Sequence, residues 1–239
     1  MKLFQYWDTG VPPEDVAACI QSVRDVNPEF EHCLYDCDRA SWFIAKRLGV
    51  RHRDAFLALA VPAMQADYFR LCALWERAGV YVDADSTAMR PLRTLLAVAP
   101  GGYITMWNRM LQNHVLAIPS PGNPFIGAVL ELATRNIEAR LQDRAFEVTG
   151  PALFNQIWMA VDLEGAHEDE HLRRNPDLAL TSAAEAVAAL YPGAGEALAS
   201  MERRHEMFTE QWLRRVEELS YRDSPSEWQT WKGPIYREA

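Results

Sequence analysis

Residues 62–90 read P-A-M-Q-A-D-Y-F-R-L-C-A-L-W-E-R-A-G-V-Y-V-D-A-D-S-T-A-M-R, and this stretch decides the fold. Apolar residues at helical spacing predict an amphipathic helix over about 63–78, and Gly79 predicts its end. The triplet V-Y-V at 80–82 predicts a short buried strand. Asp83 and Asp85 follow at the carboxyl end of that strand, where an open α/β sheet holds its ligand site.

The two carboxylates are separated by Ala84 alone, so both can converge on one hard divalent cation or its water shell. Oxygen ligands suit Mn²⁺ or Mg²⁺, and such an ion keeps open positions for substrate phosphates. The pattern therefore predicts a diphosphate ligand. A bare Asp-x-Asp also occurs by chance about once in a chain of this length. For the upstream copy, Asp36-Cys37-Asp38, we expect only that Asp38 caps the next helix.

A charged pair lies on the helix before the strand. Asp67 and Arg70 are three residues apart and share one helical face, on a helix that is otherwise mostly apolar. They either form a partly buried structural ion pair or bind a polar ligand, and the sequence leaves both interpretations open.

The pattern P-A-M-Q-A-D-Y-F-R-x(8)-G-V-Y-V-D-A-D resembles the signature region of glycosyltransferases with a DXD sugar-binding motif. This group includes the Och1-like mannosyltransferases of glycosyltransferase family 32 and, more distantly, the glucosylating domains of large clostridial toxins. The resemblance covers the first half of the chain well and the second half poorly. It implies a GT-A-type α/β fold, a Rossmann-like mixed sheet flanked by helices, with a helical C-terminal portion. It also implies sugar transfer from a UDP-sugar or GDP-mannose with retention of anomeric configuration.

The same resemblance implies roles for individual residues. Asp85 and Asp223 would ligate Mn²⁺ or Mg²⁺, while Asp83 would share the metal shell or hold the ribose. Asp67 and Arg70 would hold hydroxyls of the donor sugar. The resemblance also implies donor contacts from two aromatic residues at strand ends, Trp7 and Tyr81; Trp7 would stack on the base, although it could equally close the core.

The C-terminal pattern Asp223-x-x-Ser226-x-Trp228 is similar to the acidic residue, serine and tryptophan that close over the metal and diphosphate in the toxin-like transferases. Here Asp replaces the usual Glu, and the His that precedes a Ser-Trp pair in the Och1-like branch is missing. The departure leaves the subfamily and the donor open.

The periodicity of apolar residues predicts the remaining strands and helices. Thr149-Gly150-Pro151 starts a helix whose N-terminal amides could face a phosphate or a sugar hydroxyl, and it resembles a Thr-Gly-Pro of the same families. The alternation of strands and helices predicts a largely parallel start to the sheet. The expected strands are 3–7, 31–35, 102–107, 115–118 and 178–180, with a hairpin or surface loop at 108–113; the expected helices include 53–60, 91–97, 123–142, 152–161 and a long one over 195–221.

Length, composition and charge predict the number of domains, the kinds of binding partner and the location of the protein. With 239 residues, of which 49% are hydrophobic, the chain is expected to form one domain, residues 1–239, with a nucleotide-sugar half at 1–120 and an acceptor half with a C-terminal lid at 121–239. A net charge of −9 argues against nucleic-acid binding. Four cysteines without a Cys-x-x-Cys pair, no apparent signal peptide and no long apolar run predict a cytoplasmic protein without a membrane span.

Parts of the sequence are also compatible with three other functions. His167 to His171 match H-E-x-x-H, but polar neighbours on all sides favour a surface segment over a metalloprotease. A haloacid-dehalogenase-like phosphatase would use Asp83 as nucleophile and Asp85 as acid, yet only Lys232 is available downstream as its cation. A sugar-nucleotide-binding protein without turnover is the third. The acceptor stays open among polysaccharide, lipid-linked sugar, small molecule and protein.

Overall fold

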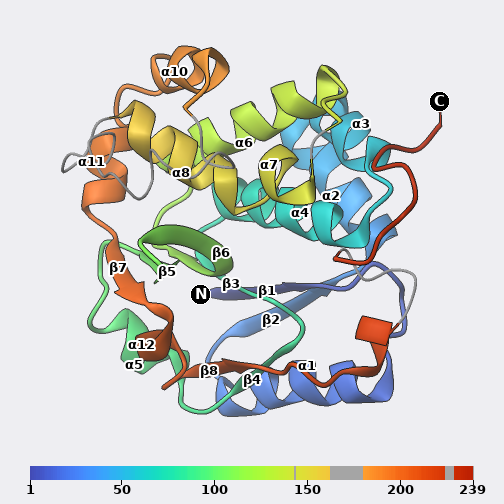
Figure 1. Cartoon of the computed structure of the whole chain (residues 1–239). Coiled ribbons are helices and arrows are strands. Elements are labelled where there is room, and N and C mark those ends of the chain that lie inside the picture. The colour runs from blue at the N-terminus through green and yellow to red at the C-terminus, as the bar shows by residue number, and fades with distance from the viewer. Residues whose placement is uncertain (143, 162–179, 224–228, 239) are drawn as a thin grey trace.

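The computed structural model describes residues 1–142, 144–161, 180–223 and 229–238, and of Asp223 only the backbone. A six-stranded mixed sheet, in the order β2-β1-β3-β6-β5-β7, runs through the centre (Figure 1). β1 pairs in parallel with β2 and β3, β6 is antiparallel to β3 and β5, and β7 is parallel to β5. The strands are β1 Lys2–Tyr6, β2 Glu31–Tyr35, β3 Gly79–Val82, β5 Tyr103–Trp107, β6 Met110–Ile118 and β7 Glu202–His205.

Helices cover both faces of this sheet (Figure 1), which confirms the mixed α/β fold flanked by helices. One face carries α2 Cys37–Leu48, α3 Val50–Ala58, α4 Pro62–Glu76, α6 Pro124–Glu138, α7 Ala145–Val148 and α8 Pro151–Ala160, with α10 Ser182–Ala188 and α11 Ala194–Ala199 beside them. The other carries α1 Glu14–Val26, α5 Leu92–Leu96, α12 Glu206–Thr209 and the two-stranded ribbon of β4 Ser86–Ala88 and β8 Leu213–Arg215. A short 3₁₀ helix, η3 Ser220–Asp223, follows β8.

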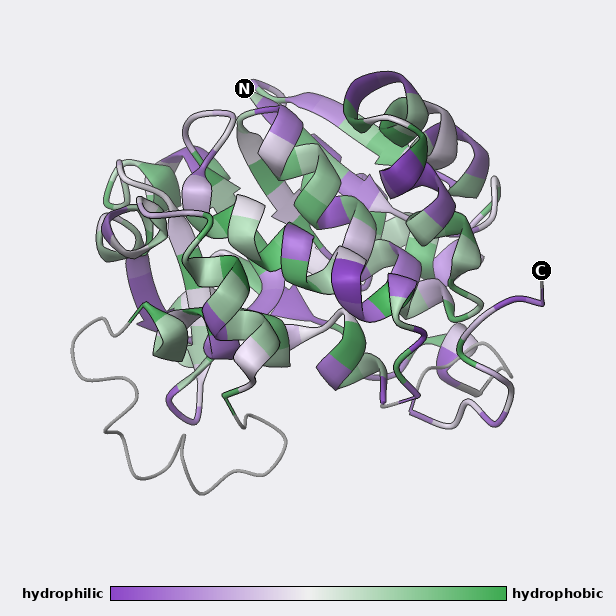
Figure 2. Cartoon of the chain, turned by 90° about the horizontal axis from the view of Figure 1, so that it is seen from above, coloured by the Kyte–Doolittle hydropathy of each residue, from purple (hydrophilic) through white to green (hydrophobic). Residues whose placement is uncertain are grey.

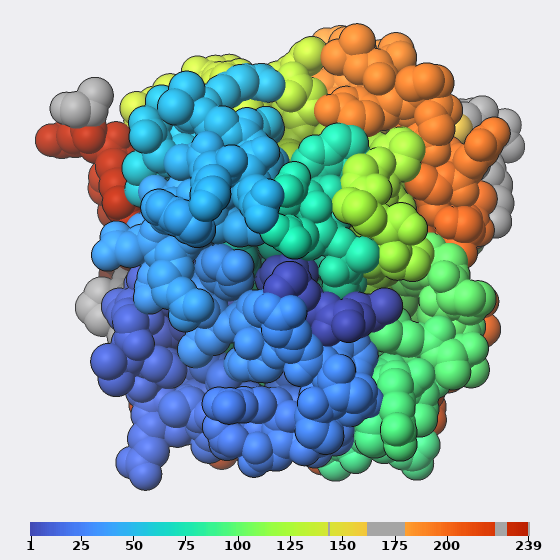
Figure 3. All heavy atoms as spheres, turned by 180° about the vertical axis from the view of Figure 1, so that it is seen from behind, coloured from blue at the N-terminus to red at the C-terminus, as the bar shows by residue number. Residues whose placement is uncertain are grey.

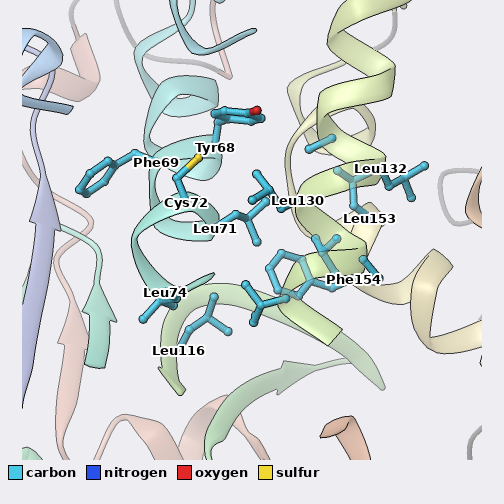
Figure 4. Packing of buried hydrophobic residues seen from close by; sticks show 14 of the residues in the cluster. Tyr68, Phe69, Leu71, Cys72, Leu74, Leu116, Leu130, Leu132, Leu153 and Phe154 are labelled. Atoms are coloured by element: carbon cyan, nitrogen blue, oxygen red, sulfur yellow. The ribbon is translucent and has the colours of Figure 1, made fainter. Parts of the chain in front are cut away.

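The helix predicted over 63–78 forms α4, which is buried on several sides within the helical layer. Tyr68, Phe69, Leu71 and Cys72 are fully buried on different sides of the helix; Figure 4 shows Tyr68 and Leu71 on the side toward α6 and Phe69 on the opposite side. From behind, α2 and α3 lie beside α4, which lies beside α6 (Figure 3). Seen from above, the helices carry a mixture of polar and apolar residues along their length (Figure 2). A helix with apolar residues all round is stable only inside a core.

The prediction of one long helix over 195–221 is wrong. This stretch forms α11, β7, α12, β8 and η3 in succession. Glu202–His205 pairs with β5 and Leu213–Arg215 pairs with β4, so ladder hydrogen bonds to distant strands outweigh the helix propensity of its Glu and Arg residues. The expected strand at 178–180 falls mostly outside the described residues, as does His167 to His171.

The expected hairpin after β5 is confirmed at Asn108 and Arg109. Both have positive φ values, 46° and 64°, as in the primed turns that suit the twist of hairpins. Residues 110–113, expected in the same loop, belong to β6 instead, which runs from Met110 to Ile118. Their side chains are therefore held by the sheet.

The cap of α2 differs from the prediction, because Asp36 and not Asp38 is its N-cap. The Asp36 carboxylate accepts a hydrogen bond from the Arg39 backbone N–H at 2.8 Å, whereas Asp38 is exposed in the first turn.

We expect Asp36→Ala to lower the free energy of unfolding by about 1 kcal/mol, since the helix loses its side-chain cap. Asp38→Ala removes only a charge near the helix dipole and is expected to cost less, about 0.3–1 kcal/mol. Urea unfolding of both variants measures this difference. An equal loss in the two variants would contradict the assignment of the cap.

None of the helices in the described part of the chain combines the length and the apolar character needed to cross a membrane.

Candidate active site

A pocket of about 360 Å³ opens where β1 and β3 end. It is lined by residues of β1 and the loop after it, α4, β3, β6, α7 and the C-terminal segment, namely Tyr6, Trp7, Asp8, Pro62, Ala63, Ala66, Asp67, Arg70, Tyr81, Asp83, Ala84, Asp85, Trp107, Gln112, Asn113, His114, Ala145, Phe146, Pro151, Arg215 and Tyr221. Segments from both halves of the chain therefore meet at one cavity.

Arg70 is the centre of a buried charged network. One Nη atom lies 2.9 Å from Asp67 Oδ1 and 3.1 Å from Asp83 Oδ1, and the other donates to the Asn113 backbone carbonyl. The guanidinium also lies 4.4 Å from the centre of the Tyr81 ring, which is fully buried behind it. A cation held by two carboxylates, a carbonyl and an aromatic face has little freedom to move. The structure thus places Asp67, Arg70, Tyr81 and Asp83 together.

Two residues of other elements complete the environment of Asp67. The Asn113 side-chain amide donates to Asp67 Oδ1 at 2.9 Å, and the Thr149 hydroxyl donates to Oδ2 at 3.3 Å. Thr149 belongs to the predicted Thr149-Gly150-Pro151 helix start, so this segment contacts Asp67 through a hydroxyl group, and its Pro151 lines the pocket.

Burial changes the titration of these carboxyls. It raises the pKa of Asp67 to about 7, although Arg70 acts in the opposite direction. Burial also raises the pKa of Asp83, again against the attraction of Arg70. On β6, burial lowers the pKa of His114 to about 4, so its imidazole is neutral at pH 7.

The raised pKa of Asp67 predicts a pH-dependent cost in stability. Between about pH 4 and pH 7 the unfolded chain releases this proton while the folded chain keeps it, so stability falls as the pH rises. We expect the free energy of unfolding of Asp67→Asn to rise relative to that of the wild type by about 3 kcal/mol between pH 4.5 and pH 8, at about 1.4 kcal/mol per pKa unit. Urea unfolding across this range measures the difference.

The matched control is Asp25→Asn, at an exposed position on α1. It makes the same chemical change outside the pocket. A pH-independent difference between Asp67→Asn and the wild type would show that the folded state does not hold the proton.

Asp85 has an asymmetric environment. Its Oδ2 atom contacts the Arg222 guanidinium at 2.7 Å, the Arg215 Nε at 3.2 Å and the Tyr221 hydroxyl at 3.2 Å. Its Oδ1 atom is buried and has no hydrogen-bond partner among the described residues. A buried carboxylate oxygen without a donor is expensive, and a hard cation would satisfy it. The oxygen ligands of the Asp pair therefore fit Mn²⁺ or Mg²⁺.

The described side chains alone supply no cluster of three metal-ligating residues. Asp223, the further ligand predicted from the sequence, directly follows Arg222, whose guanidinium contacts Asp85. Ser226 and Trp228 lie outside the described residues. Trp7 lines the pocket and packs edge-to-face against Tyr221, with ring centres 5.2 Å apart.

Sequence reasoning did not assign Asn113, His114, Arg215 and Arg222 to the site, although the polarity of residues 108–113 is also compatible with lining one. The triplet Gln112-Asn113-His114, polar within an otherwise apolar strand, could have revealed the first two, because buried polar side chains in a strand need partners. No local signal marks the two arginines, which lie in a stretch that reads as a solvated helix. Their role depends on the path of the chain.

Two comparisons with known proteins found similarity, one in sequence and one in fold. Residues 13–101 match the family model described as glycosyltransferase sugar-binding region containing DXD motif, and this range includes Asp67, Arg70 and the Asp83/Asp85 pair. A search of curated proteins gave no match. A solved structure titled PaToxG Glycosyltransferase is similar in fold, with a TM-score of 0.53, 16% sequence identity and coverage of 82% of this chain and 86% of that one. Residues 13–101 are thus similar to the DXD sugar-binding region of glycosyltransferases, and the α/β fold of the chain is similar to that of a solved glycosyltransferase.

Proposed function

We propose that the protein is a metal-dependent retaining glycosyltransferase that uses a UDP-sugar or GDP-mannose as donor. The observation that carries this proposal is the convergence of Asp83, Asp85 and the Asp67–Arg70 pair on one pocket of about 360 Å³. Retention is implied by the resemblance to the DXD families.

The donor would lie across the ends of β1 and β3. Trp7, at the rim beside Tyr221, would stack on the base, and Asp83 would hold the ribose or share the metal shell. Asp67 and Arg70 would hold hydroxyls of the sugar, a role supported by their opposite charges and fixed positions. Tyr81 supports Arg70 from behind and would act as a positioning residue.

Asp85 and Asp223 would hold Mn²⁺ or Mg²⁺, which when bound neutralises charge on the leaving diphosphate. The residues of the chain would orient the donor and exclude water around the breaking bond. Asp223, Ser226 and Trp228 would close over the diphosphate as a lid. The acceptor, of unassigned class, would enter past the later half of the chain, which contributes Ala145, Phe146 and Pro151 to the pocket.

Release of UDP or GDP from a panel of sugar nucleotides, measured with Mn²⁺ and with EDTA, tests the proposal. We expect hydrolysis of one donor with Mn²⁺ and none with EDTA. Nuclear magnetic resonance of the released or transferred sugar then gives its anomeric configuration. Equal turnover in EDTA would overturn the metal dependence, and an inverted product would overturn retention.

The phosphatase alternative makes a different prediction for the same preparation. It would hydrolyse p-nitrophenyl phosphate and leave sugar nucleotides intact. That chemistry needs a lysine beside Asp83, but no lysine is among the described residues that line the pocket, and Lys232 is exposed.

A further inference from the structure

Asp85 has contacts with two arginines that the proposed function does not explain. A carboxylate that is to bind a divalent cation is already in contact with two guanidinium groups, those of Arg215 and Arg222. A cation arriving alone would meet two positive charges within a few ångströms of its ligand. Like charges at such distances repel strongly where water is largely excluded.

The position of the two arginines follows from well-defined contacts. Arg215 lies opposite Ser86 in the β4–β8 ribbon, directly after the Asp pair. The segment carrying Arg222 is tied to α1, because the Asp15 carboxylate accepts hydrogen bonds from the backbone N–H and the hydroxyl of Ser220. The backbone is thus held on two sides, and the long guanidinium side chains can change partners without moving it.

A permanent structural ion pair would leave neither carboxylate oxygen unsatisfied. Here Asp85 Oδ1 is buried and lacks a hydrogen-bond partner in the described part of the chain, while both arginines contact Oδ2. The side chain of Arg215 is still 38% exposed and lines the pocket, so it is free to reach a ligand there. A half-satisfied network of this kind suits an exchange of partners.

Phosphate oxygens are the partners that guanidinium groups bind best, often through two parallel hydrogen bonds. A nucleotide sugar carries one negative charge on each phosphate, which balances an incoming divalent cation. Arrival of both together therefore keeps the local charge unchanged, whereas arrival of the cation alone does not.

We propose that Arg215 and Arg222 are the resting counter-ions of Asp85 and transfer to the donor's diphosphate when it binds, so that metal and diphosphate bind cooperatively. This inference rests on the proposed function and adds residues that recognise the diphosphate. It predicts opposite effects of one substitution on two affinities. Removing a guanidinium strengthens Mn²⁺ binding to the free protein and weakens binding of the nucleoside diphosphate.

The test measures Mn²⁺ binding to the full chain by electron paramagnetic resonance, alone and with saturating UDP or GDP. For the wild type we expect at least about a 10-fold tighter Mn²⁺ affinity with the nucleotide, within the usual range of coupling between sites. In Arg215→Gln and Arg222→Gln, Mn²⁺ affinity without nucleotide should rise several-fold, and nucleotide affinity should fall about 10-fold or more.

Two further variants separate charge from geometry. Arg214→Gln is the matched control, because Arg214 neighbours Arg215 on β8 but is exposed and is not among the residues that donate to Asp85; it should change neither affinity. Arg222→Lys keeps the charge and loses the planar fork, so Mn²⁺ affinity alone should stay near the wild type while the coupling decreases. Unfolding temperatures of all variants verify that they are folded.

A lower unfolding temperature with unchanged or weaker Mn²⁺ affinity in both Gln variants would overturn the inference, since that result describes a structural ion pair. Equal effects of Arg214→Gln, or no Mn²⁺ binding under any condition, would also overturn it. Failure of sugar transfer is seen separately, as absence of donor hydrolysis. If the two affinities change in opposite directions but no donor is hydrolysed, the result refutes the proposed function and supports the transfer of Arg215 and Arg222 from Asp85 to the diphosphate.

Discussion

Replacement of Asp85 by asparagine is expected to reduce donor turnover by about 10³-fold or more, while the chain stays folded. The substitution keeps the shape of the side chain and removes its negative charge, and a neutral amide is a poor ligand for a hard divalent cation. Loss of one fixed electrostatic group at a reacting centre typically costs about 10²–10³-fold, and loss of a metal adds to this.

The upstream Asp-x-Asp copy supplies the control for this experiment. Asp38→Asn makes the same chemical change at an exposed residue in the first turn of α2, outside the pocket, and should leave turnover within about two-fold of the wild type. Steady-state hydrolysis of the preferred sugar nucleotide at several Mn²⁺ concentrations measures both variants. Retention of near-normal turnover by Asp85→Asn would remove the basis for a metal at the Asp pair.

Arg70→Met is expected to lower the free energy of unfolding by about 3–5 kcal/mol. The Arg70 side chain is only 4% exposed and contacts Asp67 and Asp83, which are 13% and 27% exposed, so its loss leaves two largely buried carboxyl groups without a cation. Breaking a buried ion pair from one side has this cost because the remaining charge cannot regain its hydration. The donor affinity should fall with it, since Asp67 and Asp83 are no longer held in place.

A surface pair provides the comparison for Arg70. Arg53 contacts Asp54 at 2.7 Å, but both side chains are well exposed, and Arg53→Met should cost less than about 1 kcal/mol. Arg70→Lys should recover only part of the loss, because an ammonium group cannot reach both carboxylates and the Asn113 carbonyl as a planar guanidinium does. Urea unfolding at pH 7 measures all three variants. An equal cost for Arg53→Met and Arg70→Met would contradict the buried network.

Local patterns in the sequence were sufficient for the fold class and for half of the site. The periodicity of 62–76 and the V-Y-V triplet identified the helix and the strand that place Asp67, Arg70, Asp83 and Asp85. These four residues lie within 19 positions of one another, on two consecutive elements. Spacing within a helix and the end of a strand are short-range properties, so a single stretch contains the information.

The secondary structure of the C-terminal part could not be predicted from local patterns. Glu202–His205 and Leu213–Arg215 became strands only because β5 and β4 offered free edges to pair with. A stretch rich in Glu and Arg reads as a solvated helix when no partner is known, since strand formation depends on cross-strand context. The same limit concealed Asn113, whose side chain becomes informative only beside Asp67.

The sequence by itself determined the α/β class, the helix at 62–76 and the Asp pair at the end of the following strand, because each depends on residues that are neighbours in the chain. Only the tertiary structure decided what surrounds Asp85. Arg215 and Arg222 lie 130 and 137 residues from it in the sequence and reach it through the β4–β8 pairing and the attachment of η3 to α1. Contacts at such separation are set by how the whole chain packs, and no local pattern encodes them.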